Sequence, residues 1–147
     1  MDSSGPESPG EGTGGAPGPS GTATPLEQAL HAARALILAD LAAGGVAEAD
    51  VVSLVEESIT QRRWWVEQWP EGAAYVAGLV AQDVQDGLLE RYGRWPICPV
   101  CRTGDPHALD VDPPLGADPH WVCAEAGVQV AAVGSLGALP GFGTGRP

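Results

Sequence analysis

All three cysteines of the chain lie in its second half, and two of its three histidines lie between them. Cys98 and Cys101 form a CxxC motif, and Cys123 follows after a proline-rich stretch. Two thiolates three positions apart on a tight turn can bind one metal ion, and Zn²⁺ prefers thiolate and imidazole ligands in a tetrahedron. The spacing therefore predicts a structural site for Zn²⁺, with no other cofactor indicated.

Three cysteines leave one position of a tetrahedral site for a histidine. His107 opens an expected strand shortly after the CxxC motif, where it can converge with Cys123. His120 lies three residues before Cys123 in a strand-forming sequence, and residues three apart in a strand face opposite sides. We therefore prefer Cys98, Cys101, His107 and Cys123 as metal ligands, with the set that uses His120 as the alternative.

Other roles of the cysteines have less support. A thioredoxin-type CxxC motif is expected at a strand-to-helix junction of a βαβ unit, whereas proline-rich turn sequence and a strand pattern follow Cys101. Buried thiols without a metal are the plain alternative. A lone CxxC motif is only moderately specific, so the third cysteine and the histidine carry much of the prediction.

The sequence assigns no catalytic residue. The chain has no lysine, which removes a Walker A loop and Schiff-base chemistry, and it has neither an HExxH motif nor a deaminase signature. A catalytic zinc usually keeps one position open for water. The alternative function is therefore a zinc-dependent hydrolase with an open metal site, in which Glu125 or Asp110 would act as base.

The residues before the CxxC motif predict a helical unit over residues 24–93. Thr24, Pro25 and Glu27 form a capping motif, and apolar residues then recur at steps of three and four. Helices are expected over about 25–43, 51–69 and 71–92, packed as an antiparallel unit. Residues 1–23 contain no aromatic or branched aliphatic side chain, so we expect a disordered N-terminal tail.

The metal ligands fall in a β module over residues 94–136. Alternating patterns predict strands over 107–112, 120–123 and 128–133, and a flexible tail is expected over 137–147. So small a sheet has little core of its own, and a metal would supply stability. The fold class is therefore α+β, with a three-helix antiparallel unit followed by a small three-stranded antiparallel module.

The turn Trp95-Pro96-Ile97-Cys98-Pro99, a histidine close behind it and the later Trp-x-Cys at 121–123 resemble zinc-ribbon domains. They resemble more loosely some small uncharacterised bacterial proteins with the same pattern. The resemblance covers residues 95–136 and implies a zinc-ribbon-like module, but it indicates almost nothing about activity. The family usually has a second CxxC pair, where this chain has only Cys123.

Charge and composition limit the classes of binding partner and the cellular location that we expect. The chain carries a net charge of -12, which opposes nucleic-acid binding and leaves a nucleic-acid-associated zinc ribbon as the least favoured function. No segment predicts a membrane span or a secretion signal, so we expect a cytoplasmic protein. Adjacent Trp64 and Trp65 cannot share one helical face, so one of them could contact a protein partner.

These observations favour a non-enzymatic protein-interaction or regulatory module with a structural zinc. The evidence is a closed set of four ligands, a candidate exposed tryptophan and the predicted tails. The sequence identifies neither the protein partner nor the oligomeric state.

Overall fold

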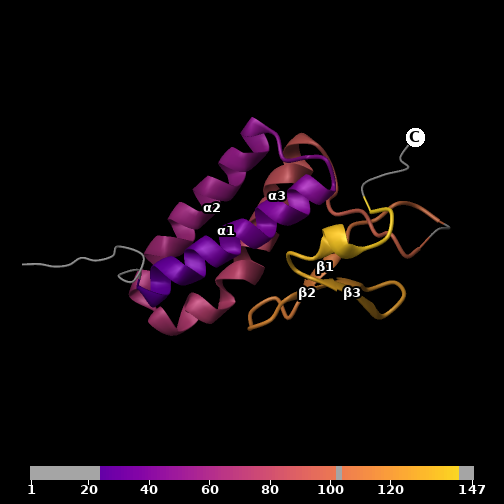
Figure 1. Ribbon diagram of the computed structural model, residues 1–147. Coiled ribbons are helices and arrows are strands. Elements are labelled where there is room, and N and C mark those ends of the chain that lie inside the picture. The colour runs from indigo at the N-terminus through magenta and orange to yellow at the C-terminus, as the bar shows by residue number, and fades with distance from the viewer. Residues whose placement is uncertain (1–23, 102–103, 143–147) are drawn as a thin grey trace, which may run out of the picture.

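The computed structural model describes residues 24–101 and 104–142. In this part of the chain three packed helices are followed by a three-stranded antiparallel sheet, which confirms the predicted α+β fold class (Figure 1). The predicted disorder of residues 1–23 lies outside the described residues, as do residues 143–147 of the predicted C-terminal tail. No helix in the described ranges is both long and apolar enough to cross a membrane.

The first two helices, α1 (Pro25–Ala43) and α2 (Ala49–Gln68), are joined by a short turn. The Thr24 side chain accepts a hydrogen bond from the Glu27 N–H, and Pro25 occupies the first turn of α1, as the capping motif predicts. The second helix begins slightly earlier than its expected start at residue 51, with Glu48 at its N-cap.

The segment expected to be a single helix over residues 71–92 has two parts. It starts as a 3₁₀ turn, η2 (Pro70–Tyr75), and continues as α3 (Val76–Arg91). Glycine is required within this turn, because a Cβ atom on Gly72 would lie only 2.5 Å from the Trp65 ring. After α3, Gly93 has a φ of 114°, and its N–H donates to the Leu88 carbonyl, which closes the helix.

Each helix buries an apolar stripe in a shared core, as the steps of three and four predict. The stripes continue under the sheet, whose inner face adds its own buried side chains to the same cluster. The central residues are fully buried or nearly so: Leu30, Ile37 and Leu41 of α1, Val55 and Val66 of α2, and Val80, Val84 and Leu88 of α3.

The sheet consists of β1 (Asp110–Asp112), β2 (His120–Cys123) and β3 (Val128–Ala132), in the order β1-β2-β3. A short 3₁₀ turn, η3 (Leu136–Ala138), follows and packs against α1. The strands are short, and the central one alternates, with Trp121 and Cys123 buried. Trp121 is fully buried and packs edge-on against Trp95, with 5.3 Å between ring centroids.

A buried carboxylate joins the helical unit to the sheet. Asp40 lies on α1 with no exposed surface, and Oδ2 accepts hydrogen bonds from Trp121 Nε1 at 2.8 Å and from the Gly134 N–H at 2.6 Å. Its Oδ1 atom accepts from the Leu136 N–H at 3.0 Å. Burial raises the pKa of Asp40, although these three hydrogen bonds act in the opposite direction.

The tryptophans near the end of α2 differ in exposure. Trp64 points away from the core and is 64% exposed, whereas Trp65 is half-buried. The Trp65 ring packs edge-on against Trp69 at 5.1 Å, and the Arg62 guanidinium lies 5.8 Å from its centroid. These contacts place Trp65 against the η2 turn and leave Trp64 as the outward-facing indole of α2.

Candidate metal centre

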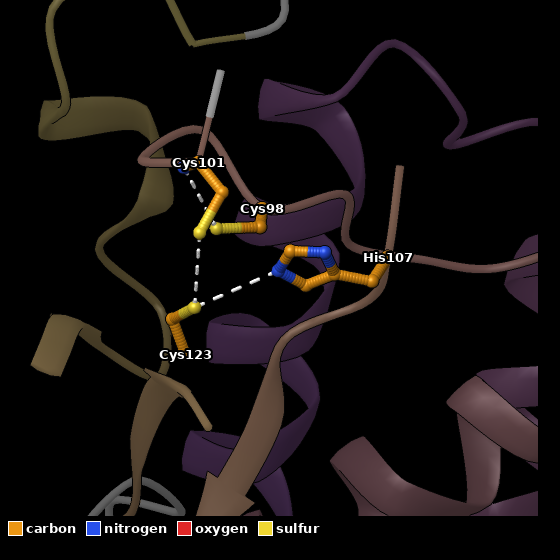
Figure 2. Close-up of side chains that lie close together, drawn as sticks. All are labelled: Cys98, Cys101, His107 and Cys123. Carbon is orange, nitrogen blue, oxygen red and sulfur yellow. Dashed lines mark hydrogen bonds between the residues drawn. The ribbon is translucent and has the colours of Figure 1, made fainter. Parts of the chain in front are cut away.

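A short backbone ladder places the CxxC turn next to His107. The Cys98 N–H donates to the His107 carbonyl at 2.8 Å, the Leu109 N–H donates to the Pro96 carbonyl at 2.8 Å, and Ile97 pairs with Ala108 as an antiparallel bridge. This pairing brings the start of the CxxC turn beside the residues that lead into β1. Figure 2 shows the result, with the side chains from both segments pointing toward one another.

The third segment is β2, whose last residue is Cys123. Its alternating burial turns Cys123 toward the cluster, where Sγ lies 3.5 Å from Cys101 Sγ and 3.5 Å from His107 Nε2 (Figure 2). The potential ligand atoms of Cys98, Cys101, His107 and Cys123 all lie within 4.8 Å of one another. The four residues that the sequence predicts as ligands therefore form one cluster.

The spacing within the cluster suits a tetrahedral zinc ion. With Zn–S bonds of about 2.3 Å, two sulfurs on a tetrahedron lie about 3.8 Å apart, and a sulfur and an imidazole nitrogen lie slightly closer. The contacts of 3.5 Å from Cys123 are close to these values. Three thiolates and one imidazole are also a soft donor set that selects zinc over magnesium or calcium. The cluster can therefore hold a metal ion without a change in the fold.

Backbone N–H groups support two of the sulfurs. The N–H groups of Val100 and Cys101 both donate to Cys98 Sγ at 3.4 Å, and the Ala126 N–H donates to Cys123 Sγ at 3.3 Å. Such hydrogen bonds stabilise the thiolate form, which is the form that binds metal. Cys123 therefore sits in its own supporting turn, although the residue three positions later is an alanine and not a second cysteine.

The two histidines of the β module have different environments. His107 Nδ1 lies 3.2 Å from the Asp105 carbonyl, so an Nδ1–H that donates there leaves Nε2 free to face Cys123. His120 instead has Nδ1 at 2.9 Å from the Asp118 carbonyl and lies outside the cluster. The structure thus brings His107 and not His120 to the cysteines, as the opposite faces of β2 predict.

The cluster shifts the proton affinities of its members. A hydrogen bond from the Ala126 N–H and contact with His107 lower the pKa of Cys123 to about 7. The hydrogen bond with Cys123 raises the pKa of His107 to about 9, and hydrogen bonding with Cys123 raises the pKa of Cys101 to about 11. One thiolate is therefore favoured in the protein alone, and a cation would favour further ionisation.

A shallow, mainly polar hollow lies beside the cluster. Cys101, His107 and Glu125 all contribute to its lining. Asp110 is exposed on β1 and does not line this hollow. Of the two carboxylates considered as a base for a hydrolase, Glu125 is therefore the one near the metal ligands.

Two residues that position the site were not identified from the sequence. Asp40 holds the sheet to α1, and Trp95, three residues before Cys98, packs against Trp121. A signal for Asp40 was present, because it lies between Ile37 and Leu41 on the apolar stripe of α1, where an acid requires a buried partner.

Comparison with known sequences covers most of this fold. Residues 26–133 match a family described as a domain of unknown function (DUF8819), a range that includes nearly all of the helical unit and all four clustered residues. No curated protein and no solved structure matches the chain.

Proposed function

We propose that this chain, which belongs to the DUF8819 family, is a non-enzymatic zinc-binding protein that serves as an interaction or regulatory module. In this proposal Zn²⁺ is held by Cys98, Cys101, His107 and Cys123. The ion closes a zinc-ribbon-like module and holds it against the helical unit. The metal has a structural role, and the working surface lies on the faces around it.

The observation that carries this proposal is the cluster of four potential ligands, three thiols and one imidazole. Structural zinc sites use four protein ligands, often three or four of them cysteine, whereas catalytic sites usually keep one position for water. The supporting N–H···S bonds at Cys98 and Cys123 are of the kind that stabilise structural thiolate sites. Zinc would also stabilise a sheet of three short strands that has little apolar interior of its own.

Exposure and charge support an interaction with protein rather than nucleic acid. Trp64 is 64% exposed on the outer face of α2, and exposed tryptophan is enriched in interaction hot spots. The net charge of -12 repels a phosphate backbone. Three free thiols fit a reducing compartment, so we place the protein in the cytoplasm.

The metal site can be tested by zinc analysis of purified variants. We expect one zinc per chain in the unaltered protein, and a large loss of bound zinc in His107→Ala and Cys123→Ser. His120→Ala is the matched control, because His120 is a half-buried histidine of the same sheet that lies outside the cluster. Full zinc content and unchanged melting temperature in His107→Ala would refute the proposed ligand set.

A zinc-dependent hydrolase is the second candidate, favoured by the position of Glu125 beside Cys101 and His107. Cobalt substitution separates the two functions. A four-ligand site gives the intense visible bands of tetrahedral cobalt thiolate, unchanged by added azide. Bands that shift with azide would indicate an exchangeable position and would favour the hydrolase.

The interaction surface can be tested with a pull-down from native lysate. We expect Trp64→Ala to release a bound protein that the unaltered chain retains. Leu115→Ala is a suitable control, since Leu115 is 55% exposed in the loop between β1 and β2. Equal recovery with both variants would exclude Trp64 from the contact, and a gel shift at low salt would contradict the charge argument.

A further inference from the structure

An apolar cavity of about 500 Å³ lies beside the CxxC turn, and Cys98 is the residue of the four-residue cluster that lines it. It is bounded by the turn between α1 and α2, by the end of α3 and by the last described residues of the chain. Its volume lies within the range of small-molecule pockets, roughly 300–1,000 Å³. Most of its lining is apolar: Val46, Val51, Leu88, Trp95, Ile97 and Phe142.

One wall of this cavity holds an unpartnered hydrogen-bond donor. Trp95 is only 7% exposed, and its Nε1 atom is buried without a hydrogen-bond partner among the residues that the structure describes. The neighbouring indole of Trp121 shows the contrast, because its Nε1 donates to Asp40. Nearly all buried polar groups in proteins are hydrogen-bonded, so an orphaned donor indicates a missing acceptor.

The donor lies under the part of the cavity wall that carries no side chain. A Cβ atom on Gly44 would lie 3.4 Å from Trp95 Nε1, and Gly44 itself lines the cavity. Gly44 has φ -88° and ψ 0°, a conformation that any residue can adopt. The backbone conformation therefore does not require glycine at position 44. The effect of having glycine there is that no methyl group lies close to the indole N–H.

The charges at this cavity indicate an uncharged ligand. Glu48 and Arg94 are exposed residues of opposite sign on its lining, so they offer no net charge. The net charge of -12 also disfavours an anion. A neutral molecule with an apolar body therefore suits the cavity better than an anion, and a cation would face the positive end of the Trp95 N–H group.

Residues 1–23 and 143–147 lie outside the described structure, and neither segment contains an aromatic or branched aliphatic side chain. By composition, these two segments offer little apolar side-chain surface for such a cavity. A separate molecule is therefore the better candidate for the occupant.

We propose that this cavity binds an uncharged, mainly apolar small molecule. Trp95 Nε1 is buried behind Gly44 in the unbound chain, so the wall at Gly44 shifts on binding and lets a carbonyl-type oxygen of the ligand accept a hydrogen bond from this donor. The apolar lining removes the body of the ligand from water, which supplies most of the affinity. The single donor orients the molecule. This site is separate from the metal centre, although Cys98 and Pro99 form part of its wall.

Nile red is a suitable probe, because it is uncharged, mainly apolar and carries a carbonyl acceptor. We expect saturable binding to the zinc-loaded full chain, with increased and blue-shifted fluorescence. Val46→Trp should fill the cavity and weaken binding at least tenfold. Leu115→Trp adds the same ring at an exposed loop residue outside the cavity and should leave binding unchanged.

Two further variants test the hydrogen bond. Trp95→Phe removes the donor and keeps an aromatic ring, and Gly44→Ala places a methyl group over the donor. Each should weaken Nile red binding about fivefold, the effect of losing roughly 1 kcal/mol. Zinc content and melting temperature are measured for every variant, so that a failure of the metal proposal is distinguished from a failure of this one.

Saturable binding that Val46→Trp abolishes, with zinc content unchanged, would support the proposal. Absence of Nile red binding to the unaltered protein would overturn it and would favour an apolar side chain of a protein partner as the occupant. Equal binding to Val46→Trp and to the unaltered protein would also overturn it. If Trp95→Phe has lower zinc content or a lower melting temperature than the unaltered protein, its Nile red binding is set aside. The role of the donor is then decided by Nile red binding to Gly44→Ala.

Discussion

The Nε1 atom of Trp121 donates a hydrogen bond of 2.8 Å to Oδ2 of Asp40, a residue 81 positions earlier in the chain. Both residues have no exposed surface. The bond connects β2 of the sheet to α1 of the helical unit, and the Gly134 and Leu136 N–H groups donate to the same carboxylate. The two parts of the fold are thus joined by a polar contact inside an otherwise apolar core.

Asp40→Asn should lower the free energy of unfolding by about 2–3 kcal/mol, because its NH₂ group must face one of three buried donors. Urea unfolding of the zinc-loaded protein measures the change. Asp86→Asn, at an exposed position of α3, is the control and should alter stability by less than about 0.5 kcal/mol. Equal unfolding midpoints for the two variants would show that the buried carboxylate does not hold the sheet.

Gly134→Ala should be strongly destabilising for two reasons. Gly134 has φ 100°, and a Cβ atom there would lie 2.3 Å from Leu36 Cδ2. We expect a loss of about 2–4 kcal/mol, measured by thermal or urea unfolding. Gly93→Ala separates the two causes, because Gly93 has φ 114° but nothing within 4 Å of the added atom. A loss in Gly134→Ala no larger than in Gly93→Ala would rule out the close approach to Leu36.

Local patterns in the sequence predicted much of this structure. The capping residue Thr24 and the apolar stripes predicted the helices, because both signals act within a few residues. The alternation of β2 predicted that His120 and Cys123 face opposite sides, and the structure places only Cys123 in the cluster with His107. In each case the prediction needed only the spacing of residues that lie a few positions apart in the sequence.

The features that the sequence did not predict depend on distant contacts. The three donors to Asp40 come from residues more than 80 positions away, and no local pattern specifies such a pairing. The 3₁₀ turn η2 replaces the first turn expected for the third helix, and within it Gly72 lies close to the Trp65 ring of the preceding helix. The cavity beside Trp95 is formed by several segments at once, so it could be found only after they were placed in space.

The turn after Cys123 predicts a rescue of the metal site. The Ala126 N–H donates to Cys123 Sγ, as the Cys101 N–H does to Cys98 Sγ, so Ala126 occupies the position of the second cysteine in a CxxC motif. Ala126→Cys should therefore restore zinc binding to His107→Ala, measured by zinc content and by competition with a chromophoric chelator. Glu125→Cys is the control, because a cysteine one residue earlier lacks this relation to Cys123 Sγ. Equal recovery with both cysteines would show that any nearby thiol suffices.

Zinc loading at neutral pH should release at least two protons per ion. Hydrogen bonding with Cys123 raises the pKa of Cys101 to about 11 and that of His107 to about 9. Both groups therefore hold a proton in the metal-free protein and must lose it to bind the ion. It follows that zinc affinity rises as the pH increases toward 9 and falls as the solution is acidified. Calorimetry in buffers of different ionisation enthalpy counts the protons.

The contact between His107 and Cys123 can be isolated in the metal-free protein. His107→Ala should raise the pKa of Cys123 above its value of about 7, because the imidazole contact that helps to lower it is lost. Titration of the ultraviolet absorbance of the thiolate against pH measures the change. His120→Ala, which alters a histidine outside the cluster, should leave this titration unchanged. If the two variants titrate alike, the Cys123–His107 contact does not hold a proton.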